Sequence, residues 1–284
     1  MAITALAALD TATKTCAKEL AVSREPRPFA GALSFVEARH PAARYVTQVR
    51  AVIKEKREVA KGTLLVIFDL LGQEVDFKPG QYFWVTLLDP PYDDEKGPRR
   101  HISVVTSPNE RGLLGLCTRL RDTAFKRSLA ELPIGAEVDV EEPKGTFLLP
   151  DDTDQPYVFI AGGIGITVFH SMLRYIVEEQ LPYRVTLFYS NRDRESAAFL
   201  EELHDLEQAD PNLKVVLTMT DDPSWEGEKR RIDAEFLRDH LGEDLQSFIY
   251  LIAGPPAMVE GVVGTLEAAG VPEERLRPAR FSGY

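Results

Sequence analysis

The sequence contains few cysteines, and no two of them stand at the spacing of a metal site. Only Cys16 and Cys117 occur in 284 residues, far apart in the chain. A cluster or zinc ion held by several thiolates is therefore excluded within this chain, and we expect no metal site. Low cysteine usage is typical of the reducing cytoplasm, which is the compartment we expect.

Long apolar runs are also missing. The longest, around residues 158–169, contains three glycines and is too short to cross a bilayer. The first residues carry no basic segment, and Asp10 follows soon after them. We therefore expect neither a membrane span nor a signal peptide.

Basic residues are fewer than acidic residues. The chain has 33 Lys and Arg against 45 Asp and Glu, a net charge of −12, which makes nucleic acid and anionic membranes poor partners. We interpret Arg99 and Arg127 as ordinary surface charges. They belong to a basic cluster that also contains Arg100, Arg119, Arg121 and Lys126.

The chain is long enough for two domains with apolar cores. Residues 1–44 show no sustained hydrophobic period and form an N-terminal extension, with a short helix possible over 11–20. From residue 45 to 150, short β-type runs are punctuated by Gly and Pro, which predicts a small antiparallel barrel. Its expected strands lie at 45–53, 63–68, 81–87, 102–105, 115–118 and 137–140, with one helix over 123–132.

From residue 151 to 284 the pattern changes to an alternation of strands and helices. The expected strands lie at 157–160, 184–189, 214–219 and 248–253, and the expected helices near 167–179, 198–209, 233–241 and 257–269. Such alternation predicts a doubly wound parallel sheet. The fold class is therefore β followed by α/β: an antiparallel barrel, then a parallel-sheet domain.

Two segments have the chemistry of anion sites. Thr123 is a good N-cap residue, which leaves the N–H groups of Ala124 and Phe125 free at a helix start. Gly162-Gly163-Ile-Gly165 with Thr167 lies between an expected strand and an expected helix, where glycines let backbone N–H groups approach a phosphate. The first anion site lies in the β-rich segment and the second in a strand–helix–strand segment. This order suggests that the chain binds two nucleotides that face each other.

The order of four motifs resembles the ferredoxin–NADP reductase superfamily of FAD-dependent oxidoreductases, over residues 45–284. The motifs are the barrel with Arg100-His-Ile-Ser103, the Thr123 helix start, the glycine loop, and Ala253-Gly-Pro255. The resemblance implies an FAD-binding barrel and an NAD(P)-binding domain. It also implies that Arg100 pairs with the FAD pyrophosphate and that Ser103 offers its hydroxyl to flavin N5.

The chain departs from the family pattern at several motif positions. Ile102 stands where the family has an aromatic residue, Val168 where it usually has Pro, and Ala253 where it has Cys. An aromatic near the C-terminus covers the flavin in this family, a role that falls to Phe281 or Tyr284, although Arg280 replaces the common acidic residue. The candidate catalytic residues are Ser103, Phe281 and Tyr284. The candidate cofactor-binding residues are Arg100, His101, Ile102, Ser103, Cys117, Thr118, Arg119, Thr123, Ala124, Phe125, Gly162, Gly163, Gly165, Thr167, Ser190, Arg192, Ala253, Gly254 and Pro255. We read Cys117 itself as a small buried strand residue, not a reactive thiol.

The sequence is compatible with either NADH or NADPH. Ser190 and Arg192 suit a 2′-phosphate, whereas Asp221 and Asp222 suit a free ribose hydroxyl. The function implied is hydride transfer from NAD(P)H to FAD, and then electron transfer to a separate acceptor: ferredoxin, flavodoxin, an oxygenase component or a quinone-like molecule. The alternatives are a nucleotide-binding sensor without catalysis and a reductase of free flavin.

Overall fold

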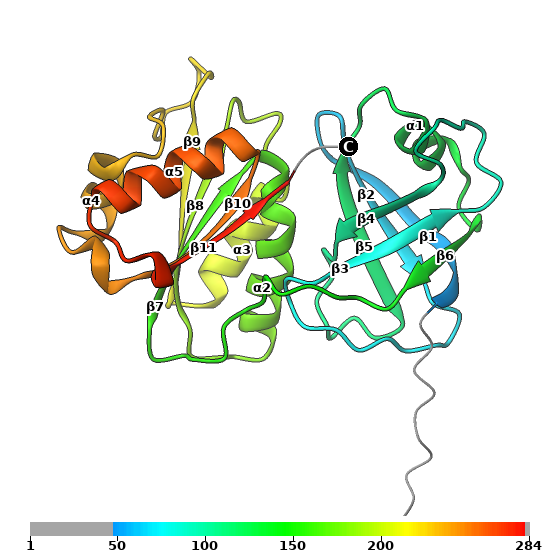
Figure 1. Cartoon of the computed structure of the whole chain (residues 1–284), viewed down its shortest axis with the longest axis horizontal. Helices are drawn as coiled ribbons and strands as arrows, with labels where there is room; N and C mark the ends of the chain where they lie inside the picture. Colours follow the sequence, from blue (N-terminus) through cyan, green and yellow to red (C-terminus); the bar gives the residue numbers. More distant parts are fainter. Residues whose placement is uncertain (1–47, 282–284) are drawn as a thin grey trace, which may run out of the picture. The chain divides into compact units, whose positions relative to one another are not determined.

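The computed structural model describes residues 48–281, all of which belong to one compact unit. Their strands form a six-stranded antiparallel sheet in the first half and a five-stranded parallel sheet in the second (Figure 1). The expected fold class, an antiparallel barrel followed by a doubly wound α/β part, is confirmed. The helix considered at 11–20 lies outside the described residues.

The antiparallel sheet has the strand order β4-β3-β6-β1-β2-β5. It closes into a barrel where the Val105 N–H, just after β4, donates to the Gly115 carbonyl in β5 at 2.9 Å. Alternate residues of β3 are buried, and Phe83 from this strand meets Phe68 edge to face in the core. The elements are β1 (Gln48–Ala60), β2 (Thr63–Asp69), β3 (Tyr82–Leu87), β4 (Arg99–Ser103), β5 (Leu113–Arg119), α1 (Ala124–Glu131) and β6 (Glu137–Glu141).

Strand β1 is longer than the sequence predicts. The expected strand ends at residue 53, because a charged run from Lys54 to Glu58 breaks the apolar alternation. In the structure β1 continues to Ala60, which pairs with Thr63 across a tight turn. Backbone pairing along this hairpin needs no apolar side chains, so the charged run is compatible with a strand.

The parallel sheet has the order β11-β10-β7-β8-β9. Helices α2 and α3 pack in one apolar cluster, and α4 and α5 pack in another, so the sheet is covered on both faces. The principal elements are β7 (Pro156–Gly162), α2 (Ile166–Glu178), β8 (Arg184–Asn191), α3 (Leu200–Ala209), β9 (Leu213–Met219), α4 (Ala234–Leu241), β10 (Ile249–Gly254), α5 (Pro256–Ala268) and β11 (Leu276–Arg280). Short 3₁₀ turns lie at Gly163–Gly165, Leu245–Ser247 and Glu273–Arg275.

Strand β11 is an element for which the sequence analysis has no counterpart. Leu276–Arg280 pairs in parallel with β10, and the Phe281 N–H donates to the Gly254 carbonyl at 2.9 Å. The strand contains Pro278 and two arginines, which hide it from pattern analysis, but an edge strand tolerates them. The end of the described chain is thus fixed beside the end of β10.

The barrel and the parallel sheet are joined by polar contacts on one side of α2. The His170 ring lies within 2.9 Å of the Val105 carbonyl through Nδ1 and within 2.8 Å of the Glu202 carboxylate through Nε2. Through these two contacts the ring links α2 to the barrel and to α3. The Ser171 hydroxyl donates to the Thr106 carbonyl at 2.6 Å, and Arg57 of β1 lies 3.2 Å from Glu202.

Candidate cofactor-binding site

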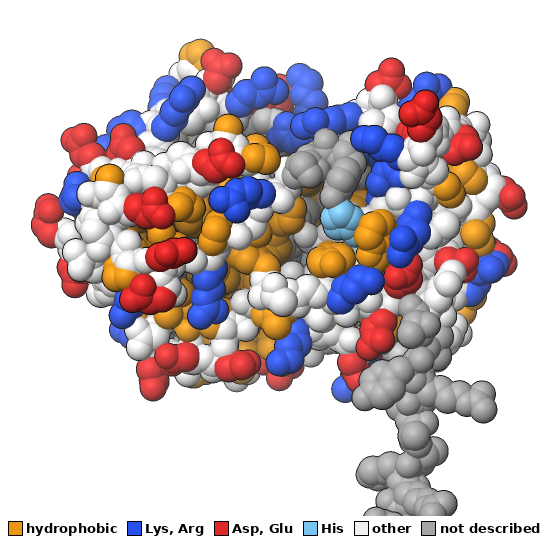
Figure 2. All heavy atoms as spheres, in the orientation of Figure 1, with side chains coloured by type: hydrophobic (Ala, Val, Ile, Leu, Met, Phe, Trp, Pro, Cys, Tyr) orange, Lys and Arg blue, Asp and Glu red, His pale blue; other side chains and the backbone are white. Residues whose placement is uncertain are grey.

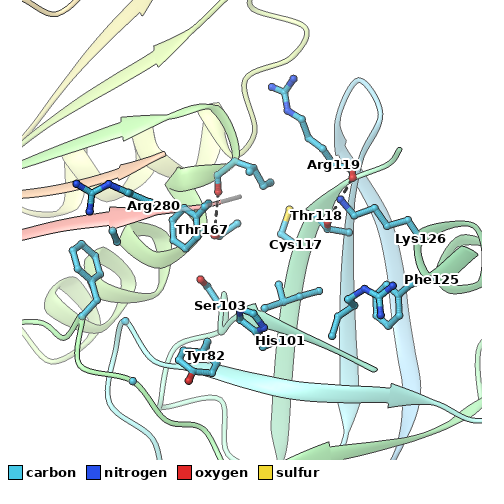
Figure 3. Close-up of a pocket in the computed structure, with 18 of the residues that line it drawn as sticks. Tyr82, His101, Ser103, Cys117, Thr118, Arg119, Phe125, Lys126, Thr167 and Arg280 are labelled. Carbon is cyan, nitrogen blue, oxygen red and sulfur yellow. Dashed lines mark hydrogen bonds between the residues drawn. The ribbon is translucent and has the colours of Figure 1, made fainter. Parts of the chain in front are cut away.

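A cavity of about 370 Å³ lies between the barrel and the parallel sheet. Residues of β3, β4, β5 and α1 line one side, and residues at the start of α2 and the end of β11 line the other (Figure 3). The predicted site residues that line it are Arg100, His101, Ile102, Ser103, Cys117, Thr118, Arg119, Thr123, Phe125, Thr167 and Phe281. Distant parts of the sequence therefore meet at one cavity.

A second group of predicted residues lies at the carboxyl edge of the parallel sheet, outside the cavity lining. Strand β7 ends at Gly162, β8 at Asn191 and β10 at Gly254, and carboxyl ends of parallel strands share one edge. The residues in this group are Gly162, Gly163, Gly165, Ser190, Arg192, Ala253, Gly254 and Pro255. Ala124 stands at the start of α1 but is not part of the lining either. Tyr284 lies outside the described residues.

The glycines at this edge have two different structural roles. A Cβ on Gly165 would lie 2.3 Å from the Ala253 carbonyl oxygen, and one on Gly162 would lie 2.9 Å from the Met258 sulfur. Gly165 must therefore be glycine, because the backbones of the loops after β7 and β10 approach closely there, whereas a Cβ on Gly162 would displace the Met258 side chain. Gly163 has a φ of +51°, and a Cβ there would meet only the Arg119 guanidinium, at 3.7 Å. Gly163 is thus required for its backbone conformation.

Arg100 is held in place by its own loop. It is 8% exposed, and its Nη1 donates to the carbonyls of Lys96, Gly97 and Arg99 at 2.8–3.0 Å. Its Nη2 lies 3.5 Å from Asp94, and the guanidinium carbon is 5.3 Å from the centre of the Phe125 ring. The guanidinium is therefore oriented before any ligand binds, which suits the recognition of an anion.

The N-terminus of α1 supplies free backbone donors beside Arg100. Thr123 is the N-cap, as predicted, and its hydroxyl accepts a hydrogen bond from the Lys126 N–H at 3.4 Å. The N–H groups of Ala124 and Phe125 have no acceptor within residues 48–281. Free amides at a helix start and a fixed guanidinium form a donor set that fits a diphosphate.

Ser103, the last residue of β4, lines the cavity. Figure 3 shows the Ser103 side chain directed toward the space between Thr167 and Cys117. Ser103 is 9% exposed, and its hydroxyl has no hydrogen-bond partner within residues 48–281. Thr167, in contrast, donates to the Ile164 carbonyl at 3.1 Å. The Ser103 hydroxyl is therefore available to a bound ligand.

Cys117 is a buried strand residue that reaches the cavity wall. Burial raises the pKa of its thiol well above the ordinary range, so the sulfur stays protonated at neutral pH. The interpretation of Cys117 as a small buried residue is confirmed.

The structure divides the basic cluster found in the sequence. Arg99 pairs with Glu141 and lies 3.9 Å from the centre of the Trp84 ring, and Arg127 lies 3.9 Å from the centre of the Tyr92 ring. The interpretation of these two arginines as surface charges is confirmed. Arg119 donates to the Ser196 carbonyl at 3.0 Å, while it still reaches the cavity.

Several lining residues are absent from the set predicted from sequence. They include Tyr82 of β3, Lys126 of α1 and Arg280 of β11, together with Arg121, Gly80, Ile164 and Ala279 and the segment 145–147. Lys126 belongs to the basic cluster, but only the structure shows that it is buried and directed at the cavity. On the face shown in Figure 2, Lys and Arg side chains gather along the upper edge.

Within residues 48–281, no helix is long and apolar enough to cross a bilayer. In the same part of the chain, no group of His, Cys, Asp or Glu is arranged to hold a metal ion.

The arrangement of a barrel, a parallel sheet and a cavity between them agrees with the comparison with known proteins. The family model described as an oxidoreductase NAD-binding domain matches residues 159–264. These findings confirm the resemblance to the ferredoxin–NADP reductase superfamily of FAD- and NAD(P)-binding flavoprotein reductases.

Two of the relatives are components of monooxygenases. The chain is 28% identical to methane monooxygenase component C from Methylosinus trichosporium, over 69% of this chain and 54% of that protein. It is also 28% identical to the reductase component of phenol 2-monooxygenase from a Pseudomonas species, over 74% and 59% of the two chains. The chain thus spans little more than half of these two proteins.

Among solved structures, the ferredoxin reductase in carbazole 1,9a-dioxygenase is similar to the chain. It superposes with a TM-score of 0.69 at 25% identity, over 82% of this chain and 69% of that one.

Proposed function

We propose that this chain is an FAD-dependent NAD(P)H oxidoreductase that delivers electrons to a separate acceptor. The observation that carries the proposal is that Ser103 of the barrel, Thr167 of α2 and Phe281 after β11 line the same cavity. FAD bound there would take up hydride from NAD(P)H and release the electrons one at a time. We further propose 45–150 and 151–284 as the limits of the two nucleotide-binding domains, with 1–44 as an extension.

The side chains of this chain would bind and orient the two nucleotides. Arg100 and the free amides at the start of α1 would bind the FAD pyrophosphate, and the Ser103 hydroxyl would donate to the flavin ring edge. Ile102 would cover the ring with an aliphatic surface, and Phe281 would occupy the face that the nicotinamide must reach. No acid–base residue is needed, because alignment of the two rings supplies the catalysis.

We propose NADH as the preferred dinucleotide. The loops after β8 and β9 are joined, because the Asp221 N–H donates to the Arg192 carbonyl at 2.7 Å. Hydrogen bonds from Ser224 and from the Arg194 N–H lower the pKa of Asp222, so its carboxylate stays charged at neutral pH. Directly after the two strands, residues 192–194 and 220–222 carry three carboxylates against two guanidinium groups: Asp193, Asp221 and Asp222 against Arg192 and Arg194. This balance disfavours a 2′-phosphate and suits a free ribose hydroxyl.

We propose a protein acceptor with an acidic surface, and an oxygenase component fits best. The names of two relatives and of one similar structure connect those proteins to oxygenase systems. Arg119, Arg121 and Arg280 line the cavity and give an acidic chain a local excess of positive charge. Electron transfer to such an acceptor should slow as ionic strength rises, because salt screens the attraction. The low cysteine content supports a cytoplasmic location.

The test is to purify the chain, identify its flavin, and titrate it anaerobically with NADH and NADPH. We expect the chain to contain bound FAD, and we expect NADH to reduce it at a lower concentration than NADPH does. In an Asp222→Asn variant, the concentrations of NADH and NADPH that are needed should become more similar. A chain that binds no flavin, or whose flavin neither dinucleotide reduces, would contradict the proposed activity. Tight binding of riboflavin at the expense of FAD would indicate a free-flavin reductase instead.

A further inference from the structure

Lys126 is a buried cation without an acidic partner. It stands in the first turn of α1, is 7% exposed and lines the cavity. Figure 3 shows its side chain extending from α1 toward Thr118 at the end of β5. Within residues 48–281, its ammonium group makes no hydrogen bond and no ion pair. A buried charge of this kind is costly unless a ligand compensates it.

Comparable cations of the barrel are compensated by the protein itself. The Lys56 ammonium donates to the carbonyls of Ala130 and Leu132 at 2.7 and 2.5 Å. Arg100 has three carbonyl acceptors and a carboxylate within 3.5 Å. Lys126 thus differs from Lys56 and Arg100, because no acceptor within residues 48–281 compensates its charge and its side chain lines the cavity.

The surroundings of Lys126 select an anion with more than one charge. Arg100 from β4 and Arg121 from the loop before α1 both act on it as like charges. Two free amides at Ala124 and Phe125 lie on the same helical turn. Burial, with the charges of Arg121 and Arg100, lowers the pKa of Lys126 to about 8.

We propose that Lys126 is a pyrophosphate-binding residue whose ammonium neutralises the FAD diphosphate, an inference that rests on the proposed function. Its backbone N–H is occupied by the Thr123 hydroxyl, so the contribution of Lys126 is its charge. Lysine, unlike arginine, loses its proton within the alkaline range in proteins, so Lys126 is the cation of this group that we expect to titrate. FAD retention should therefore weaken as pH rises above about 8, when Lys126 in the empty site loses its proton.

The experiment measures FAD release on serial dilution of the flavin-loaded full-length chain, through the rise in flavin fluorescence. The variants are Lys126→Gln, which removes the charge, and Lys126→Arg, which keeps it. Arg127→Gln is the matched control, because this next residue of α1 is exposed and contacts Tyr92 and Asp122 instead. Riboflavin, which has no phosphate, and ADP, which has the diphosphate, are measured as competitors.

We expect Lys126→Gln to raise the dissociation constant for FAD about 10- to 100-fold, the effect of losing one charged hydrogen bond. It should weaken competition by ADP similarly and leave riboflavin unchanged. Lys126→Arg and Arg127→Gln should stay within about threefold of the parent chain. Equal FAD affinity in Lys126→Gln and the parent chain would overturn the role of Lys126, whereas a parent chain that binds no FAD would overturn the proposed function as well.

The pH dependence of the parent chain is a second test that needs no variant to fold. FAD release should rise between about pH 8 and 9.5, and this rise should disappear in Lys126→Arg, whose side chain keeps its proton. A release that is flat over this range in the parent chain, or that rises equally in both proteins, would overturn the proposal.

Discussion

At the residue scale, Arg100 shows how one side chain combines a structural and a binding role. Its guanidinium closes the loop between β3 and β4 through three carbonyl oxygens, and it also lines the cavity. Replacement should therefore affect stability as well as affinity. This dual role cannot be read from the motif Arg-x-x-Ser, because the loop contacts come from residues without any distinctive pattern.

We predict that Arg100→Ala destabilises the chain and weakens FAD binding, each by about 1–3 kcal/mol, since three loop carbonyls lose their charged donor. Thermal unfolding of the flavin-free and flavin-loaded chain separates the two effects. Arg99→Ala is the control, because Arg99 is exposed and lies outside the cavity lining. An unchanged melting temperature together with unchanged flavin content would contradict both roles.

Phe281 is the last described residue, and it packs against the apolar cluster of α2 while it lines the cavity. If its ring competes with the nicotinamide for one apolar face, Phe281→Ala should tighten dinucleotide binding and speed reoxidation of the reduced protein by oxygen. Anaerobic titration and stopped-flow mixing with oxygenated buffer measure the two quantities. Phe281→Tyr is the conservative control. If Phe281→Ala matches the parent chain in dinucleotide affinity and in the rate of reoxidation by oxygen, the Phe281 ring has a packing role only.

At the scale of elements, the loops after β7 and β10 depend on close backbone contact. A Cβ on Gly165 would lie 2.3 Å from the Ala253 carbonyl oxygen. We predict that Gly165→Ala costs about 1–3 kcal/mol of stability, because the strand ends must move apart. Gly261→Ala is the control: this glycine lies within α5 with open space around it, so alanine should stabilise by up to about 1 kcal/mol. The measurement is urea unfolding of both variants and the parent chain. Equal unfolding midpoints for Gly165→Ala and the parent chain would show that the loops accommodate the added methyl group.

The sequence predicts elements with an apolar period, and it misses elements whose stability comes from their neighbours. The alternation in β3 and the apolar strands β7 and β10 are local signals, so these strands are predicted correctly. Strand β11 contains Pro278 and two arginines, and the second half of β1 is highly charged. Both segments form strands because each pairs with a neighbouring strand. The same limit applies to the site. Ser103 and Thr123 are found through motifs, whereas Lys126 is recognised only after folding has buried it.

At the scale of the whole molecule, the barrel and the parallel sheet are joined by a charged contact that depends on pH. Glu202 of α3 accepts from His170 of α2 and lies 3.2 Å from Arg57 of β1. The hydrogen bond from His170 and the charges of His170 and Arg57 lower the pKa of Glu202 to about 2, despite an opposing effect of burial. The carboxylate therefore stabilises the association of the two halves.

The sign of the pH dependence follows from this lowered pKa. A carboxylate with a lower pKa in the folded chain contributes stability that is complete above its unfolded value of about 4.5 and is lost as pH falls toward about 2. We predict that Glu202→Gln lowers the melting temperature at pH 7, and that the difference from the parent chain shrinks below about pH 4.5. The side chain is 37% exposed, so solvent screening keeps the effect modest. Glu201→Gln is the matched control, because Glu201 is exposed and its side chain makes no hydrogen bond or ion pair within residues 48–281. Calorimetry of the three proteins from pH 7 to pH 3 gives the measurement. A gap between Glu202→Gln and the parent chain that stays constant over this range would show that Glu202 acts through packing and not through its charge.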